Sequence, residues 1–327
     1  MKILIVKISS MGDILHTLPS LTDASSIISN ISFDWVIEED FVLIPKWHSS
    51  VNKVIPVSIR RWKKKWFSKK VIKERHIFYS QLKQIQYDSI IDAQGLLKST
   101  LLITRHANGI KHGYDWKSSK ELFVSLFYNF SYFIDKNQHA IERTRLLFAK
   151  SLKYKKPNSN PKFNIMKHFL NLFKFNYHAC SKKSYIIIFH ATTSIDKHWP
   201  VKHWNKLIYL LSNYNLDVKI PWYSQEEYQQ AKKISFGLNN TEILSKLSLN
   251  DIAKYIIESK AVVSVDTGLS HLTSALKKLN IILYGPTDPK LIGCFGKNQI
   301  RIVSKNNQMS SIKPEKVFNK LLKNLII

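Results

Sequence analysis

The sequence predicts an α/β protein made of two successive doubly wound parallel sheets. Short apolar runs alternate with segments of helical periodicity along most of the chain. Polar loops follow several of these runs and lead directly into the next helical segment. Residues 151–163 are rich in Lys, Pro, Asn and Ser and separate two such series. Because alternating strands and helices favour a parallel sheet covered on both faces, we expect two domains of this kind.

The first series begins with a strand over residues 2–8 and the loop Ser9–Gly12. A helix then starts near Asp13, and Pro19 predicts a kink or a short first segment. The apolar segment 122–134 is too short to span a membrane. We expect residues 120–132 to form a buried helix and regard an interfacial membrane anchor as the less favoured alternative. The other elements expected in this half are strands at 33–38, 51–57 and 87–93 and helices at 72–86 and around 142–145.

The second series repeats the arrangement after the linker. Its strands are expected at 185–189, 217–220, 262–265 and 280–284, and its helices at 165–175, 204–211, 224–234, 250–259 and from residue 272. Two such halves, each with loops at the carboxyl ends of its strands, predict a ligand cleft between them.

Composition limits the classes of function. The 327 residues carry a formal net charge of +27, which favours an anionic partner: nucleic acid, an anionic membrane surface or a phosphorylated substrate. Lys, Asn and Ile are abundant throughout, so we ascribe most of the total to compositional bias and look for clusters. The clearest cluster is segment 60–75, which interleaves Lys and Arg with Trp and Phe. The two cysteines, Cys180 and Cys294, are read as inert residues in a reducing compartment.

The chain is organised around residues 262–275, where a strand runs through Asp266, Thr267 and Gly268 into a helix that contains His271. The free N–H groups and dipole at such a helix start favour anions. Thr192, Thr193 and Lys197 follow another strand and could converge on one phosphate. The same residues also have purely structural explanations. Asp266 and Thr267 could cap the helix, His271 could be a core histidine, and Lys197 could be a surface lysine.

Several common nucleotide and metal signatures are missing from the sequence. No G-x-G-x-x-G follows the first strand, and there is no P-loop motif. No D-x-D pair occurs, and the cysteines and histidines do not have zinc-site spacing. We therefore expect no cofactor and no required metal ion.

Five segments carry a specific resemblance: MKILIVKISSMGDILHTLPSLTDA, DAQGLLKS, HATTSIDKHWP, VSVDTGLSHLTSA and YGPTDPKLIGCFGKNQ. In this order the chain resembles the lipopolysaccharide heptosyltransferases of glycosyltransferase family 9, most closely the heptosyltransferase I group. The resemblance implies the GT-B fold, in which two Rossmann-like domains face each other across a cleft. It places an acceptor domain at 1–160, an ADP-heptose domain at 161–310, and a C-terminal helix, 311–327, packed back on the first domain.

The resemblance also implies a reaction: L-glycero-D-manno-heptose moves from ADP-heptose to a Kdo residue of Kdo2-lipid A, with inversion and without a metal. Inversion requires a base, and the matching SSMGD motif makes this Asp13. Lys197 is the implied catalytic cation beside the leaving diphosphate. The implied donor-binding residues are Thr192, Thr193, Lys197, Glu227, Asp266, Thr267, Gly268, Leu269 and His271. The implied acceptor-binding residues are Ser9, Ser10, Arg60, Arg61, Lys63, Lys64, Lys120 and Arg143.

Two positions depart from the family pattern. Lys120 stands where Arg is expected, and a Lys cannot make the same bidentate contact. Segment 130–136 is apolar where family members tend to be basic. The expected partners are ADP-heptose, Kdo2-lipid A and the anionic inner-membrane surface, with peripheral attachment at its cytoplasmic face, no nucleic acid, and a monomer favoured.

Three alternative functions can be set against this one. Heptosyltransferase II would use a heptose as acceptor in place of Kdo. A basic nucleic-acid-binding protein would explain the charge of +27, although aromatic platforms occur only in segment 60–75. A binding module without catalysis is disfavoured by the presence of Asp13 and Lys197.

Overall fold

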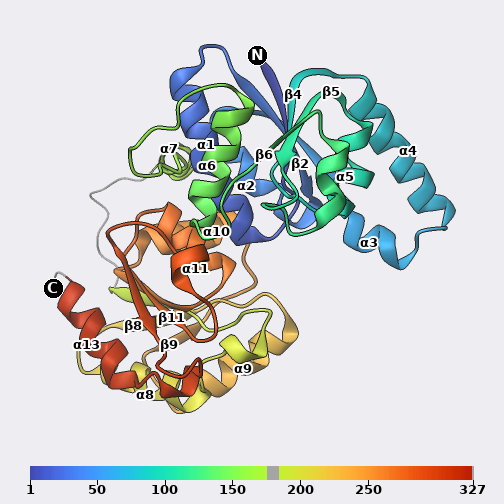
Figure 1. The fold of residues 1–327 in the computed structure, drawn as a ribbon. Coiled ribbons are helices and arrows are strands. Elements are labelled where there is room, and N and C mark those ends of the chain that lie inside the picture. Colours follow the sequence, from blue (N-terminus) through green and yellow to red (C-terminus); the bar gives the residue numbers. More distant parts are fainter. Residues whose placement is uncertain (175–183, 326–327) are drawn as a thin grey trace. The chain divides into compact units, whose positions relative to one another are not determined.

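The computed structural model describes residues 1–174 and 184–325, so Cys180 lies outside the described residues. The chain divides into two compact units, residues 1–164 and 165–327. The boundary falls four residues after the expected one at 160, in a segment without helix or strand. Each unit is built from helices and strands, which Figure 1 draws as coiled ribbons and arrows, around one sheet.

The first unit contains a six-stranded sheet in the order β3-β2-β1-β4-β5-β6, and every pairing is parallel. This order is that of a doubly wound Rossmann sheet. The central strands are nearly all apolar because helices cover both faces. Its strands are β1 (Lys2–Val6), β2 (Ser32–Glu38), β3 (Val51–Val57), β4 (Gln86–Asp92), β5 (Asn108–Tyr114) and β6 (Phe130–Tyr132).

The helices of this unit lie between successive strands, except α6, which follows the last strand. They are α1 (Met11–Ile27), α2 (Leu43–Lys46), α3 (Ile59–Lys64), α4 (Lys69–Lys83), α5 (Leu97–Leu102) and α6 (Ala140–Ser151), with short 3-10 helices η1 (Glu39–Phe41), η2 (Thr104–His106) and η3 (Leu122–Phe127). Helices α1 and α6 pack together, and Arg145 joins them through an ion pair of 2.6 Å with Asp23. Helix α1 runs through the buried Pro19 without a break, so the short first segment does not occur.

The second unit repeats the topology with the order β12-β11-β10-β7-β8-β9, again wholly parallel. Its strands are β7 (Tyr185–Phe189), β8 (Asp217–Ile220), β9 (Thr241–Ile243), β10 (Ala261–Val265), β11 (Asn280–Tyr284) and β12 (Gln299–Val303). Its helices are α7 (Met166–Phe173), α8 (Val201–Ser212), α9 (Gln225–Ser235), α10 (Leu249–Glu258), α11 (Gly268–Ala275), α12 (Pro289–Ile292) and α13 (Pro314–Asn324), with 3-10 helices η4 (Ile195–Lys197) and η5 (Met309–Ser311).

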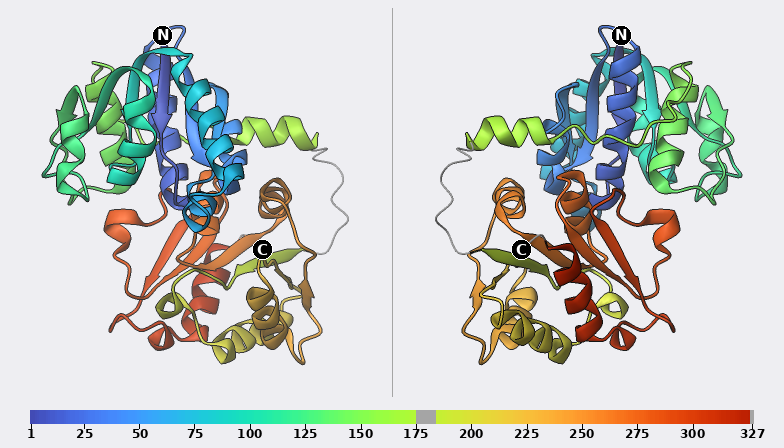
Figure 2. Two further views of the ribbon diagram at one scale, coloured as in Figure 1. Left: turned by 90° about the vertical axis from the view of Figure 1, so that its right-hand side faces the viewer. Right: turned by 90° about the vertical axis from the view of Figure 1, so that its left-hand side faces the viewer.

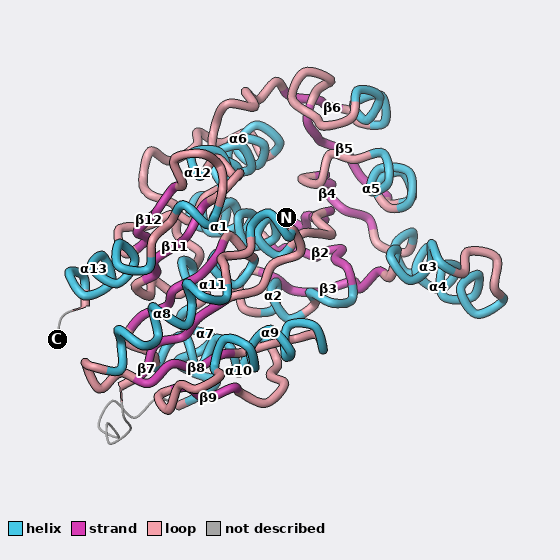
Figure 3. Tube along the Cα trace, turned by 90° about the horizontal axis from the view of Figure 1, so that it is seen from below, coloured by secondary structure: helices cyan, strands magenta, loops and turns pink. Residues whose placement is uncertain are grey.

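The predicted fold class of two Rossmann-like, doubly wound units is therefore confirmed. Figures 2 and 3 show helices on both sides of the strands in each unit. Strands β5, β9 and β12 were not predicted. Each lies in the outer part of its sheet, and β9 and β12 are edge strands with mixed polar and apolar residues. Such strands lack the continuous apolar run that identifies a central strand.

One prediction is wrong. Residues 120–132 do not form a buried helix: they form η3 and the edge strand β6, and most of their large apolar side chains are exposed. The expected C-terminal helix within segment 311–327 is present as α13. Helix α13 packs on α8 and β11 because Val317 and Leu321 belong to the core of the second unit.

No helix in the described residues combines the length and the apolarity that a membrane span needs.

Candidate functional site

The polar loops of the first unit meet where its strand order reverses, between β1 and β4. Ligands of doubly wound sheets bind at this position, beyond the carboxyl ends of the strands. The loop after β4 supports the loop after β1, because Gln94 Oε1 accepts hydrogen bonds from the backbone N–H of Ile8 and of Ser9. Asp92 accepts hydrogen bonds from the N–H of Gln94 and of Gly95, each at 3.0 Å, and shapes the second loop.

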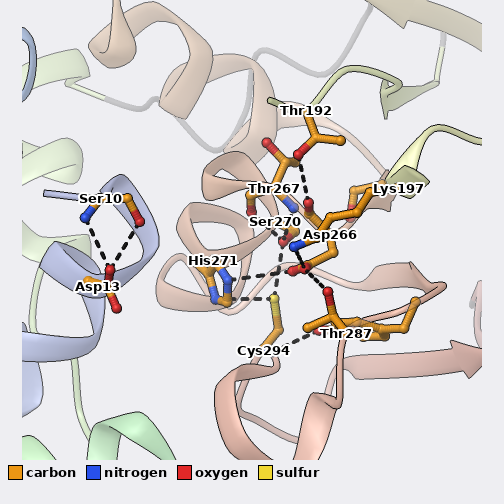
Figure 4. Close-up of polar contacts among 12 residues, drawn as sticks. Ser10, Asp13, Thr192, Lys197, Asp266, Thr267, Ser270, His271, Thr287 and Cys294 are labelled. Atoms are coloured by element: carbon orange, nitrogen blue, oxygen red, sulfur yellow. Dashed lines mark hydrogen bonds and ion pairs between the residues drawn. The ribbon is translucent and has the colours of Figure 1, made fainter. Parts of the chain in front are cut away.

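Asp13 lies in the first turn of α1, at this edge of the sheet. Its Oδ2 accepts hydrogen bonds from the backbone N–H and the hydroxyl of Ser10, both at 3.1 Å, as Figure 4 shows. Ser10 is the N-cap of α1 and Asp13 stands at the third helical position, the arrangement of a capping box. Asp13 therefore caps the helix, and this contact fixes the orientation of its carboxylate.

Cations surround Asp13. Burial alone would raise its pKa, but the positive charge of Lys7, the two hydrogen bonds from Ser10 and the charge of Lys120 together hold the pKa below its usual value. Lys7 is nearly buried at the end of β1, and its Nζ donates to the carbonyl of Ala93 at 3.0 Å. Burial lowers the pKa of Lys7, and Asp13 opposes that shift. Asp13 is therefore ionised at neutral pH.

Arg143 belongs to the same group. Its charge acts on Lys7, its Nη2 donates to the carbonyl of Ser118 at 2.8 Å, and its guanidinium lies over the ring of Tyr114. The structure thus brings the predicted residues Asp13, Ser10, Lys120 and Arg143 together. Sequence reasoning missed Lys7. A lysine directly after four apolar strand residues is the signal that could have identified it.

The four predicted cations of segment 60–75 lie on or beside α3, after β3. Arg61 is engaged within the unit, at 3.1 Å from Glu39 and 2.8 Å from Glu74. Arg60 pairs with Asp40 at 3.8 Å, while Lys63 and Lys64 are exposed. Lys98, which was not predicted, lies near Arg60 and Lys63, and burial followed by their charges lowers its pKa despite the opposing charge of Glu38.

The second unit has its own group of polar residues where the order of its sheet reverses, between β7 and β10. Lys197 Nζ lies 2.7 Å from Asp266 Oδ2, and Thr287 Oγ1 donates to the same oxygen at 2.8 Å. Thr192 Oγ1 donates to the carbonyl of Asp266 at 3.1 Å (Figure 4). Asp266 itself is buried, so these contacts orient a carboxylate that little solvent reaches.

Helix α11 begins at Gly268, beside this group. Thr267 is its N-cap, and Thr267 and Ser270 form a capping box. His271 Nε2 lies 4.0 Å from Asp266 Oδ1, and His271 Nδ1 lies 3.6 Å from the sulfur of the buried Cys294. Thr193 is exposed on the loop before η4. The residues of this loop and of the α11 start present hydroxyl, ammonium and backbone donors at one edge of the sheet, a combination that suits an anionic ligand.

Glu227 lies in the first turn of α9, where its Oε2 accepts a hydrogen bond from the N–H of Tyr223 at 2.7 Å. The carbonyl of Glu227 lies 3.2 Å from Nε2 of His190, the residue directly after β7. Glu227 is therefore near the same sheet edge as the Thr192 loop. Thr287 was missed by sequence reasoning, although its position in the loop after β11 follows the same rule as the other loops.

Within residues 1–174 and 184–325, no three His, Cys, Asp or Glu side chains gather closely enough to hold a metal ion.

Comparison with known proteins agrees with this geometry. The model of "Glycosyltransferase family 9 (heptosyltransferase)" matches residues 75–322. Lipopolysaccharide heptosyltransferase 1 of Salmonella typhimurium is 50% identical over 321 residues, covering 98% of this chain and 100% of the relative. The solved structure of the E. coli heptosyltransferase WaaC with ADP has a TM-score of 0.93 and 49% identity, covering 99% of this chain and 100% of that chain.

A second structure of the E. coli enzyme, with ADP-2-deoxy-2-fluoro heptose, has a TM-score of 0.90 and 48% identity, again covering 99% of this chain and 100% of that chain. The family match spans more than half of the chain, and the similarity to the Salmonella protein is nearly full-length. The chain therefore belongs to glycosyltransferase family 9, the heptosyltransferases.

Proposed function

We propose that the chain transfers L-glycero-D-manno-heptose from ADP-heptose to a Kdo residue of Kdo2-lipid A during synthesis of the lipopolysaccharide inner core. The observation that carries this assignment is the 50% identity to a lipopolysaccharide heptosyltransferase 1 over essentially the whole chain. The similar E. coli structures with ADP and with an ADP-heptose analogue support ADP-heptose as the donor.

Asp13 is the proposed general base of an inverting reaction. Its Oδ2 is held by Ser10, and the carboxylate is ionised because Lys7, Ser10 and Lys120 oppose the effect of burial on its pKa. Such a weak base removes the proton of the acceptor hydroxyl as the new glycosidic bond forms, when that proton becomes acidic. Ser9, Lys120 and Arg143 would hold the carboxylate-bearing acceptor sugar beside it.

The leaving ADP is the proposed ligand of the second unit. Lys197 has three N–H donors, of which one faces Asp266, and another would neutralise the diphosphate as negative charge develops there. Thr192, Thr193 and the backbone N–H groups of Thr267, Gly268 and Leu269 supply further donors. Asp266 and His271 would contact the heptose or the phosphate, and Glu227 the ribose of the adenosine. With these donors, the reaction is proposed to need no metal ion.

The lipid-linked acceptor implies that the protein acts at a membrane, and we place it peripherally at the cytoplasmic face of the inner membrane, as a monomer. The exposed cations Arg60, Lys63 and Lys64 would contact acidic groups of the acceptor or of the membrane surface. Arg61 would take part only by exchanging its contacts with Glu39 and Glu74.

The test is transfer from ADP-heptose to Kdo2-lipid A in the presence of EDTA, with wild type, Asp13→Asn and the exposed control Asp88→Asn. Wild type and control should give product, and Asp13→Asn should lose about 10²- to 10⁴-fold in kcat, the usual contribution of a general base. Full activity of Asp13→Asn would assign the base to another residue. Loss of activity in EDTA that added Mg²⁺ restores would contradict metal independence. Product only with a heptose-bearing acceptor would indicate the second transfer step instead.

A further inference from the structure

The first unit carries an exposed apolar surface that the proposed chemistry does not use. It consists of Leu122, Phe123, Leu126, Phe130 and Phe133, hereafter the apolar face, which are 62%, 64%, 77%, 53% and 57% exposed. The segment from η3 to the end of β6 contains no acidic residue. Scattered single apolar side chains are ordinary on protein surfaces, but several large ones within one short segment are typical of an interaction site.

The segment is held in place by its other residues. Val124 and Ile134 are buried, and the N–H of Ile134 donates to the hydroxyl of Ser118 at 2.7 Å. Asn129 bonds the backbone of Lys111 through both its side chain and its own N–H, each at 2.9 Å. Because the core contacts are already made by these residues, exposure of the apolar face is a property of the folded unit.

Charged residues border this surface. Lys150 Nζ donates to the carbonyl of Phe133 at 2.9 Å, and Lys117 lies over the ring of the exposed Trp116. Lys120 and Lys136 adjoin the segment along the chain, and Lys111 contacts it through Asn129. The acidic residues nearby are Asp115, Glu121 and Asp135. The five lysines of this border outnumber its three acidic residues, so the border has a positive balance.

The apolar face also adjoins the acceptor side of the unit. Lys120, two residues before Leu122, acts electrostatically on Asp13 and Lys7. In the proposed reaction the accepting Kdo is attached directly to a lipid whose acyl chains lie in a bilayer. The base must therefore work close to the headgroup plane, and an apolar surface beside it suits the boundary between headgroups and acyl chains.

Resting on the proposed function, we infer that the apolar face docks into the leaflet of an anionic bilayer, with the bordering lysines at the headgroups. A peripheral protein that binds a membrane stably needs two such contributions, apolar insertion and electrostatic attraction, and both are present here. The sequence departs from the expected basic pattern in this segment. Docking therefore relies on inserted side chains as well as on charge.

The experiment measures binding of the full chain to vesicles of phosphatidylglycerol and phosphatidylcholine in equal amounts. The variants are Phe123→Ser, Leu126→Ser and the pair together, and the matched control is Phe236→Ser, which is 87% exposed in the second unit. Burial of one large apolar side chain changes a partition constant by about one to two orders of magnitude. We expect each single variant to bind roughly tenfold more weakly, the pair roughly a hundredfold, and the control as wild type.

Binding of the double variant at wild-type strength would overturn the inference. Complete loss of wild-type binding at high salt, with no difference between wild type and variants at low salt, would show purely electrostatic docking and also overturn it. If light scattering without vesicles shows a wild-type dimer that the double variant converts to monomer, the surface is an interface between two copies.

Activity separates this inference from the proposed function. The double variant should transfer heptose to an acceptor stripped of its acyl chains at the wild-type rate, and to Kdo2-lipid A in vesicles at least tenfold more slowly. Equal slowing on both acceptors would indicate a defect in the site and contradict docking. Failure of the wild type on both acceptors would refute the proposed function, while the vesicle-binding comparison would still decide whether the surface meets a bilayer.

Discussion

Replacement of Lys7 by Met tests how the first unit controls its proposed base. Met keeps the length and apolar stem of Lys but removes the charge. Lys7 is the strongest of the groups that lower the pKa of Asp13, acting against burial, which raises it. An opposite charge at contact range lowers a carboxyl pKa by about 1 to 3 units. With Lys7 replaced and Ser10 and Lys120 still in place, we expect the pKa of Asp13 to rise.

This rise has a defined kinetic signature. Asp13 must be ionised to act, so the acid limb of kcat/KM against pH should move to higher pH. Near pH 8 the carboxylate remains ionised in both proteins, and ionisation alone leaves their rates within about threefold. Toward the acid end of the pH range the variant should lose more activity than the wild type, because a larger share of its Asp13 is then protonated.

The assay is kcat/KM for heptose transfer from about pH 4.5 to 8.5, with Lys2→Met as control. Lys2 lies at the opposite end of β1, where it pairs with Asp34 at 3.3 Å, so its loss should leave the acid limb unchanged. An unshifted limb in Lys7→Met would refute the reasoning. A uniform loss at every pH would show that Lys7 acts by binding substrate or by shaping the loop, and not through the pKa of Asp13.

Three further predictions concern other parts of the structure. Thr287→Val removes one of the two bonds to Asp266 Oδ2, and steady-state kinetics should show about tenfold lower kcat/KM, since a hydrogen bond to a charged group contributes ~1.5–3 kcal/mol. Burial lowers the pKa of His48 to about 4, below the ordinary 6.5, so its stabilising effect is complete above pH 6.5 and is lost as the pH falls toward 4. Urea unfolding measures the free energy of unfolding at about pH 7.5 and at about pH 4.5. The decrease in this free energy between the two pH values should be roughly 2.5 kcal/mol smaller in His48→Gln than in wild type. Arg145→Met leaves Asp23 without its buried partner and should cost about 3–5 kcal/mol, seen as a Tm lower by roughly 10 °C in calorimetry, whereas the exposed Lys150→Met should shift it little.

The site was predictable to the extent that it depends on local sequence. Asp13 follows a strand and a capping serine, and Lys197 follows a strand and two threonines, so their positions at sheet edges could be inferred. The residues around them could not be inferred, because they come from distant segments. Thr287 bonds Asp266 from the loop after another strand, and Lys120, which lies between β5 and β6, acts on the charge of Asp13. The pairing of Arg61 with Glu39 and Glu74 is likewise invisible in the basic segment read by itself.

The sequence by itself determined the central strands, the helices that follow them and the family. Apolar runs flanked by capping residues encode these elements within a few residues, and long motifs are specific. Only the tertiary structure decided the fate of segment 120–134 and of the C-terminal helix. An apolar run becomes buried only if a core has space for it: Val124 and Ile134 take that space in the first unit, so their neighbours remain exposed. Val317 and Leu321 are buried in the core of the second unit. Their burial depends on packing between distant parts of the chain.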